Sequence, residues 1–346
     1  MKDFYLSFIV TIICVALAAA WGYSNGMGVI AAASLVLILG VMEVSLSFDN
    51  AVVNASVLKE MDAKWQFIFL TVGILIAVFG MRLLFPVLIV SIATGLGLVD
   101  TTLLALNNPE EYATHLSNAH IAIAAFGGTF LLLVFLSFVL DESKELHWLG
   151  AIERRLSKLG KLDSLEILLS LVILLLLYFW LPISETQKIS MFVSGIGGVA
   201  LFIAVNSLDS LFEDEEEGKQ AVRTAKRSGF AAFLYLEVLD ASFSFDGVIG
   251  AFAITRDIVI IMLGLGIGAM FVRSLTVHLV RKGTLDTFVF LEHGAHYAIG
   301  ALAVIMLAGM VIHISEVITG LIGVAFITLA LLSSIRYNKL KLKEEN

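Results

Sequence analysis

Long apolar stretches separated by short polar connections run through the whole chain. A stretch of roughly 20 apolar residues can cross the hydrocarbon core of a bilayer as a helix. The pattern therefore predicts an all-α, polytopic membrane bundle of about ten spanning helices. We place them at about 4–24, 29–57, 65–95, 120–140, 166–183, 190–211, 229–254, 257–280, 288–311 and 314–335.

Composition agrees with a membrane protein, because 59% of the residues are hydrophobic and 15% are charged. The single cysteine, Cys14, excludes an intrachain disulfide and a thiolate cluster for a soft metal. The net charge is −8, and the chain has no long basic tract. Both features argue against nucleic acid as a partner. We expect the lipid bilayer as the surroundings of this chain and no nucleic acid.

The first apolar segment, residues 4–17, is followed by three alanines at 18–20 and so imitates a signal peptide with its cleavage site. The positive region of a signal peptide is weak here, because Lys2 stands beside Asp3. We expect the segment to be retained as the first helix.

Basic residues alternate between the two sides of the predicted spans. One side carries Lys2, Lys59, Lys64, the run 144–161, the segment 219–227, Arg281, Lys282 and the tail 336–343, and the other carries Lys188 and Arg256. The positive-inside rule then puts both termini in the cytoplasm. The acidic run at 213–219 falls in a charged cytoplasmic loop at 212–228, which we interpret as a solvated linker; a vestibule that gathers cations is the alternative.

Two apolar helices contain the same polar pattern, EVSLSFDN at 43–50 and DASFSFDG at 240–247. When Glu43 is aligned with Asp240, both serines, the last phenylalanine and the last aspartate coincide. One helix later each copy has an arginine, and each then has a histidine in the similar segments AHIAI and AHYAI. These four residues are Arg82 and His120 in the first copy, and Arg273 and His296 in the second.

Each element of the first copy lies five predicted spans before its partner, and an odd offset inverts the topology. Inverted repeats around a site at mid-membrane are a plan of secondary transporters. We predict one transmembrane domain, 1–346, with repeat one at about 25–145, repeat two at about 228–318, and a connection at 146–227. The alternative is that the duplication is a purely structural relic.

Carboxylates within the predicted spans need partners. The five acids are Glu43, Asp49, Glu237, Asp240 and Asp246. Each costs about 2.5–3.5 kcal/mol at the centre of a spanning helix, so the unpaired set would cost more than about 10 kcal/mol. Arg82 and Arg273 can neutralise two of them as counter-ions. The alternative is that the two arginines form part of a gate. Protons or a bound cation must supply the rest.

The polar residues near these acids offer oxygen ligands, which suit a hard divalent cation such as Mn²⁺, Mg²⁺ or Ca²⁺. They are the amides of Asn50 and Asn54 and the hydroxyls of Ser47 and Ser244. Imidazole nitrogen from His120 or His296 would favour Mn²⁺, although hydrogen bonding within the bundle is the simpler interpretation of both histidines.

Helical spacing puts Glu43, Ser47, Asn50 and Asn54 on one face, with Asp49 about 120° away. Either the helix unwinds near Ser-Phe-Asp so that both acids of a motif reach one ion, or the two acids face different neighbours.

In the second copy, Glu237, Asp240 and Ser244 form the matching stripe. Gly247 and Gly250 favour local unwinding of this copy in particular.

The first motif, Glu43-x-x-Leu46-x-x-Asp49-Asn50, resembles the E-x-x-L-x-x-D-N signature of the TerC family of bacterial membrane proteins, itself similar to the lysine-exporter superfamily. Glu237-x-x-Asp240, the segment FSFDGVIGAFAITRD and Arg273-Ser274-Leu275 resemble the second motif of that family. The likeness covers roughly 30–90 and 230–280, and more weakly extends to about 310. Gly247 stands where the family often has serine, and Leu265 where it often has asparagine.

TerC-like proteins are associated with tellurium resistance and with manganese export. The resemblance implies a bacterial inner-membrane transporter of a divalent metal cation, with Mn²⁺ efflux favoured and no enzymatic activity. It implies metal contacts from Glu43, Asp49, Asn50, Asp240 and Asp246.

The alternative is a membrane scaffold of a metal or tellurite stress-resistance complex, which would recruit cytoplasmic stress-response proteins and hold a metal structurally. An intramembrane hydrolase is disfavoured, because H-E-x-x-H is absent and neither Ser47 nor Ser244 has an adjacent histidine in the sequence.

Overall fold

The computed structural model describes residues 2–73, 75–162, 164–212, 229–312 and 314–344, and within them every regular element is helical. The acidic run at 213–219 and nearly all of the loop at 212–228 lie outside these residues. In chain order the elements are η1 (Lys2–Phe4), α1 (Tyr5–Ser24), α2 (Val29–Leu46), α3 (Phe48–Glu60), α4 (Ala63–Ile68), η2 (Phe69–Gly73), η3 (Ile76–Leu84), α5 (Phe85–Thr94), α6 (Leu98–Asn107), α7 (Pro109–Asn118), α8 (His120–Leu140), α9 (Ala151–Ser157), η4 (Lys158–Lys161), α10 (Leu165–Trp180), α11 (Glu185–Phe212), α12 (Gly229–Ile254), α13 (Ile258–Arg281), α14 (Thr284–Thr287), α15 (Leu291–Gly309) and α16 (Glu316–Glu344).

Seven helices within the described residues are long and apolar enough to cross a membrane, and the number rises to nine if each of two bent helix pairs is one span. The seven are Tyr5–Ser24, Val29–Leu46, His120–Leu140, Glu185–Ser207, Ile258–Arg281, Leu291–Gly309 and Val317–Lys341. The prediction of an all-α, multi-pass membrane bundle is therefore confirmed, while the count of ten spans stays a prediction.

Two predicted spans are broken in the structure. The segment 29–57 consists of α2 and α3, which meet at Ser47. The segment 65–95 contains the π-helical η2 and η3, and its two parts are bent by 47°. Other boundaries agree closely, since α12 covers the predicted 229–254 from end to end. The last helix runs beyond the predicted end, to Glu344.

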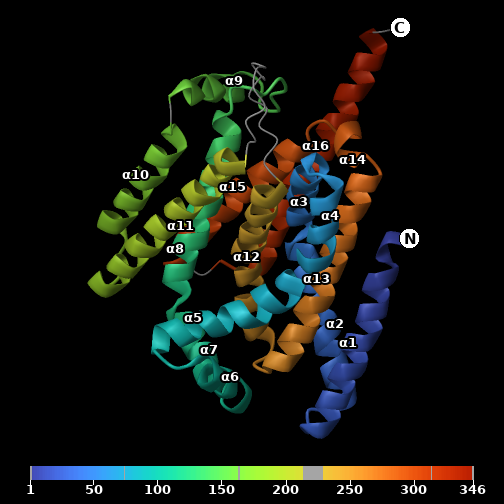
Figure 1. The fold of residues 1–346 in the computed structure, drawn as a ribbon, viewed down its shortest axis with the longest axis vertical. Coiled ribbons are helices and arrows are strands. Elements are labelled where there is room, and N and C mark those ends of the chain that lie inside the picture. The colour runs from blue at the N-terminus through green and yellow to red at the C-terminus, as the bar shows by residue number, and fades with distance from the viewer. Residues whose placement is uncertain (1, 74, 163, 213–228, 313, 345–346) are drawn as a thin grey trace.

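The middle of the bundle is formed by α8, α13 and α15, since 67%, 61% and 67% of an apolar 18-residue window in each are buried. In α1 and α16 the buried share is 17% and 22%, so most of their apolar surface is available to lipid. α9 and α14 lie at one end of the bundle, here called the α9 end, and α6 and α7 lie at the other (Figure 1).

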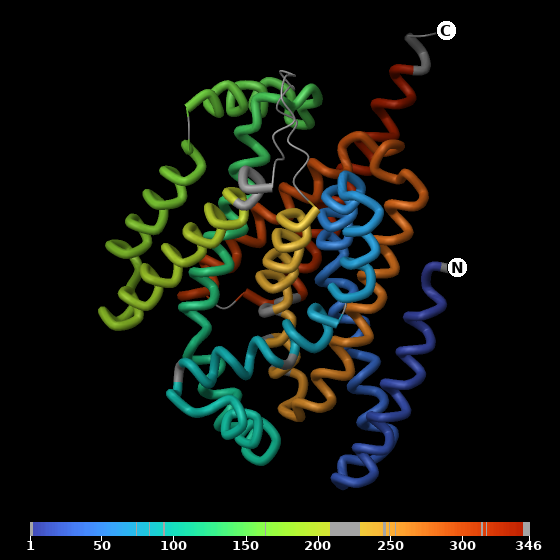
Figure 2. The backbone as a smooth tube through the Cα atoms, in the orientation of Figure 1, coloured from blue at the N-terminus to red at the C-terminus, as the bar shows by residue number. Residues whose placement is uncertain are grey.

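The two halves of the chain interleave and do not form separate lobes (Figure 2). α2 packs along α13, α12 packs against η3, and α8 packs along α15. Each acidic helix thus contacts the arginine-bearing element of the other half, as a pseudo-two-fold arrangement requires. The inverted repeat itself stays a prediction.

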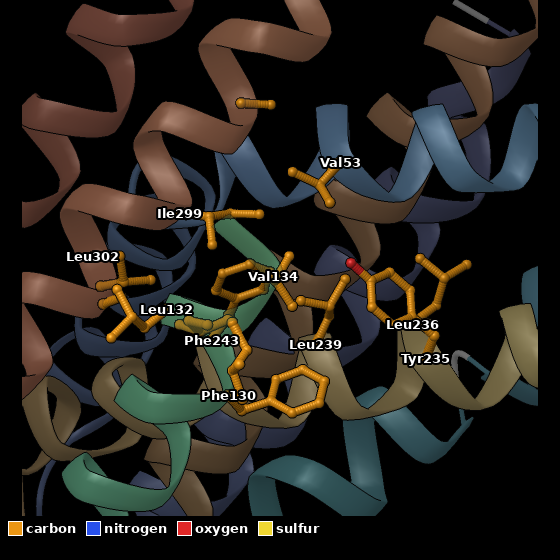
Figure 3. Close-up of a cluster of buried hydrophobic side chains, with 14 of the residues drawn as sticks. Val53, Phe130, Leu132, Val134, Tyr235, Leu236, Leu239, Phe243, Ile299 and Leu302 are labelled. Atoms are coloured by element: carbon orange, nitrogen blue, oxygen red, sulfur yellow. The ribbon is translucent and has the colours of Figure 1, made fainter. Parts of the chain in front are cut away.

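Buried apolar side chains form two clusters, with the polar motifs between them. The first cluster joins α3, α8, α12 and α15, and includes Val53, Phe130, Leu239 and Ile299 (Figure 3). The second joins α1, α2, α5 and α13 with the end of α12. Along α2–α3 the polar stretch separates Leu39 of the second cluster from residues of the first. The charged residues are therefore surrounded by apolar packing on both sides.

The N-terminal segment is tied to α13. Ser7 Oγ donates to the carbonyl oxygen of Met270 at 2.7 Å. Arg281 Nη1 donates to Asp3 Oδ1 at 2.6 Å, and His278 Nδ1 lies 3.1 Å from Asp3 Oδ2. These hydrogen bonds, that of His278 first, lower the pKa of Asp3. α1 is therefore an integral part of the helix packing.

Candidate functional site

The first motif contains a kink of one residue. Ser47, with φ −105° and ψ 18°, separates α2 from α3. Its N–H still donates to Glu43 O at 3.0 Å, and Ala51 N–H donates to Ser47 O at 3.3 Å. The helix axis can bend here while most backbone groups stay bonded, which a buried segment requires.

The second motif is unbroken, because α12 is helical throughout 240–247. The prediction that Gly247 and Gly250 ease unwinding in this copy is wrong. Gly247 has another role: a Cβ atom at this position would lie 2.6 Å from Glu43 Oε2. The missing side chain makes room for the carboxylate of the first motif.

A second glycine that we did not single out from the sequence completes this space. A Cβ atom at Gly268 on α13 would lie 2.3 Å from both Cβ and Cγ of Glu43. One turn earlier, a Cβ atom at Gly264 would lie 2.5 Å from Leu39 Cβ. Gly264 and Gly268 form a Gly-x-x-x-Gly spacing, which allows close helix contact in membranes. This spacing could have identified Gly268 from the sequence.

Glu43 is 1% exposed and forms an ion pair with Nη2 of Arg82, which is 8% exposed. Ser47 Oγ donates to Glu43 Oε1 at 3.2 Å, and Arg82 Nη1 donates to the carbonyl oxygen of Ala77 at 2.5 Å. Arg82 is therefore the counter-ion of Glu43. It lies on η3, a π-helical segment of nine residues, and such segments often occur at functional sites.

Arg273 differs from Arg82. Its Nη2 donates to the carbonyl oxygen of Leu70 in η2, and it forms no ion pair with any acid whose side chain the structure describes. Both arginines nevertheless line one cavity.

The two motifs are joined directly by a hydrogen bond. Asn54 Nδ2 on α3 donates to Asp240 Oδ1 on α12 at 2.9 Å. Together with the close approach of Glu43 to Gly247, this bond brings α2–α3 against α12 at two points.

A cavity of about 40 Å³ lies at this junction, and we call it the central cavity. Its polar lining comes from both motifs and both arginines, namely Glu43, Ser47, Asn50, Asn54, Arg82, Asp240, Ser244, Arg273 and Thr276. The predicted shared face of the first motif is thus confirmed, and so is its counterpart in Asp240 and Ser244. A space of this size holds a water molecule or a single ion.

A second cavity of about 90 Å³ lies on the other side of the kink, and we call it the Asp49 cavity. Asp49 and His120 line it, and Glu43, Ser47 and Asn50 line both cavities. Asp49 Oδ2 lies 3.3 Å from where a Cβ atom of Gly323 on α16 would be. Glu43 and Asp49 both line this cavity, and the break at Ser47 lies between them in the chain. Of the two acids, only Glu43 also lines the central cavity.

Several buried oxygen atoms have no hydrogen-bond partner among the described atoms: Asn54 Oδ1, Ser244 Oγ and both carboxylate oxygens of Glu237. Glu237 is 6% exposed and lies beside the central cavity, with Oε1 2.7 Å from where a Cβ atom of Gly73 would be. Buried polar atoms are almost always paired, so these oxygens are suited to a proton, a water molecule or a cation.

Some predicted ligands lie apart from this junction. His296 Nδ1 lies 2.9 Å from the Glu292 carbonyl oxygen, and its ring stacks on Phe138 at 3.9 Å. The two histidines thus lie in different places. For Asp246 the structure describes the helical backbone but not the side chain.

No three His, Cys, Asp or Glu side chains among the described residues lie close enough together to hold a metal ion. The central cavity instead combines two carboxylates with amide and hydroxyl oxygens. Amide and hydroxyl oxygens with few carboxylates still form ligands of hard cations, usually with water completing the shell.

Fold and site together define a polytopic helical membrane protein with a buried acidic centre between two related motifs. The chain belongs to the family described as "Protein of unknown function (DUF475)", whose profile matches residues 48–341. No curated protein matches the chain, and no solved structure does.

Proposed function

We propose that this chain is a transporter of a divalent metal cation, with Mn²⁺ efflux favoured, and that the cation passes through the central cavity. The observation that carries the proposal is the set of buried, unpartnered oxygens at the junction of the two motifs. Among the described groups Glu237 and Asp240 have no arginine partner, in contrast to Glu43. Both acids lie inside an apolar bundle, so each needs a proton or a cation as its partner.

The ligand chemistry supports a hard cation. Carboxylate, amide and hydroxyl oxygens suit Mn²⁺, Mg²⁺ and Ca²⁺, and the single cysteine is remote on α1. The resemblance of both motifs to the TerC family favours Mn²⁺ and the bacterial inner membrane. The distribution of basic residues favours an orientation with both termini in the cytoplasm.

A route through the protein follows from the two cavities. They share the wall formed by Glu43, Ser47 and Asn50, so an ion moving between them passes this wall. Arg82 closes the wall by pairing with Glu43, and it lies on the π-helical η3, a kind of segment that often occurs at functional sites. Arg82 would then be both counter-ion and gate, and its release of Glu43 would open the way for the cation.

The test is flux of radioactive Mn²⁺ into proteoliposomes that contain the purified full chain. We expect uptake above that of protein-free liposomes, and we expect Asp49→Ala, Asp240→Asn and Asp246→Ala to abolish it. Glu111→Gln is the matched control. Glu111 lies on α7, its side chain is half-exposed, and it lines neither cavity. Equal flux in the wild type and in protein-free liposomes would refute transport.

The alternative function is a membrane scaffold with a structural metal and no transport. It predicts Mn²⁺ binding to the purified protein without flux, together with retention of cytoplasmic stress-response proteins on purification from cells. The flux assay thus separates the two functions in a single experiment.

A further inference from the structure

The α9 end carries a short amphipathic element that neither the cavities nor the transport route use. α9 and η4 together span Ala151–Lys161 and turn by 100° into α10. Figure 1 shows α9 running across the end of the bundle. An element at right angles to a spanning helix lies along the membrane surface when that helix crosses the membrane.

One face of this element is held firmly against the bundle. Glu153 is fully buried; it accepts from Lys144 Nζ at 2.8 Å and from the Leu149 N–H at 3.2 Å. Ser157 is also buried, and a Cβ atom at Gly160 would lie 1.8 Å from Leu140 O. Glu153, Ser157 and Gly160 have the spacing i, i+4, i+7 and therefore share one face. This face packs against the bundle and fixes which side chains of the element point outward.

Glu153 keeps its charge in this setting. Burial by itself raises the pKa of Glu153, but the hydrogen bond and the charge of Lys144 outweigh burial, and the pKa lies below its usual value. Glu153 is the sole acid within Ala151–Lys161, and it is neutralised internally. No acid of α9 or η4 therefore offsets its exposed basic side chains.

The remaining surface of the element divides into a basic and an apolar sector. Four basic side chains are exposed, Arg154, Arg155, Lys158 and Lys161. Ile152 and Leu159 are 63% and 47% exposed, and within α9 Ile152 lies about 160° from Arg154 at 3.6 residues per turn. Basic and apolar sectors on one surface element are typical of helices that lie in the interface of a bilayer.

We propose that α9 and η4 lie in the headgroup layer and bind anionic lipid headgroups through Arg154, Lys158 and Lys161, while Ile152 and Leu159 enter the acyl boundary. The basic sector is complementary in charge to anionic lipids and not to zwitterionic ones. Asp141 and Glu142 are also exposed, and they line a cavity together with Gly160 of η4 and Glu166.

Native mass spectrometry of the full chain in mixed micelles of phosphatidylglycerol and phosphatidylcholine tests the proposal. We expect preferential retention of phosphatidylglycerol, and we expect R154Q/K158Q/K161Q to lower its apparent affinity by on the order of 100-fold. The matched control is R336Q/K339Q/K341Q, which removes three exposed charges from α16 and should retain the lipid. Equal losses in the two triple variants would overturn the assignment to α9.

Three further measurements test the proposal. Retention of phosphatidylglycerol by the wild type should fall as salt is raised, and salt-insensitive retention would contradict an electrostatic site. Inorganic phosphate alone should not displace the lipid, and displacement would show a free-phosphate site. I152S/L159S should weaken retention while unfolding in lipid-free detergent stays as in the wild type. None of these outcomes depends on Mn²⁺ transport.

Discussion

The two acidic motifs reach the same cavity with different helices and different charge balance. In the first, α2 and α3 meet at a kink, and Glu43 is bound by Arg82 and Ser47. In the second, α12 is continuous, and Glu237 has no described partner. The two motifs share both serines, the last phenylalanine and the last aspartate. Among the motif acids whose side chains the structure describes, only Glu43 has an arginine partner.

The difference arises from the elements packed around each copy. Arg82 lies on the π-helical η3 and reaches an acid of its own half, whereas Arg273 on α13 bonds to the carbonyl oxygen of Leu70. A charge bound by a fixed guanidinium contributes to stability, and a charge without one is available for a ligand. We therefore expect loss of Arg82 to affect folding, and loss of the acids without an arginine partner, such as Asp49 and Asp240, to affect ion binding.

The largest effect should follow from breaking the ion pair of the first copy. Arg82→Gln leaves the Glu43 carboxylate buried and uncompensated, which should lower the free energy of unfolding by about 3–5 kcal/mol. Thermal unfolding in detergent measures this loss. The double variant E43Q/R82Q should recover most of it, and a wild-type melting temperature for Arg82→Gln would show that the pair does not stabilise the fold.

Metal binding should depend on the second copy. Free Mn²⁺ at about 100 times its dissociation constant should stabilise the wild type by about 2.7 kcal/mol, and a chelator should remove the effect. Asp240→Asn keeps the acceptor for Asn54 Nδ2 but removes the charge, so the shift in melting temperature should vanish. A full Mn²⁺ shift in Asp240→Asn would place the ion elsewhere.

The space around Glu43 can be tested with two glycines of α13. Gly268→Ala places a methyl group 2.3 Å from the Glu43 side chain and should cost about 1–3 kcal/mol of stability. Gly266→Ala is the control, because its Cβ atom would make an ordinary contact of 3.5 Å with Val78. The control should be neutral or slightly stabilising, since alanine is the better helix former. Equal destabilisation by both would show that the contact with Glu43 is not the reason for the loss.

The smallest effect on stability should come from Glu237. Glu237→Gln removes a charge to which no described group donates, so the free energy of unfolding should change by less than about 1 kcal/mol. Mn²⁺ flux should nevertheless fall. A loss of stability as large as that of Arg82→Gln would mean that the two copies are equivalent, and the comparison would fail.

Much of this architecture follows from local sequence. The apolar runs predicted the helices, and α12 covers its predicted range without change. The shared face of Glu43, Ser47, Asn50 and Asn54 follows from the helical period, and all four line the central cavity. Unwinding near Ser-Phe-Asp was one of the two predicted outcomes, and the break at Ser47 lies in this motif. The π-helical segments were not predicted.

The role of the glycines shows the same limit. Gly247 was expected to ease unwinding because glycine is flexible, but its position opposite Glu43 makes its small size the property that matters. Nothing within a few residues of Gly247 indicates this contact, since Glu43 lies about 200 residues earlier in the chain.

Hydropathy and helical periodicity were sufficient for the class of the protein and for most of its long helices, because each depends on residues within one helix. Which acid pairs with which arginine, which oxygens remain unpartnered and where two cavities meet depended on contacts between helices. Such contacts are set by the shapes of side chains brought together from distant segments, and a linear pattern does not contain that information.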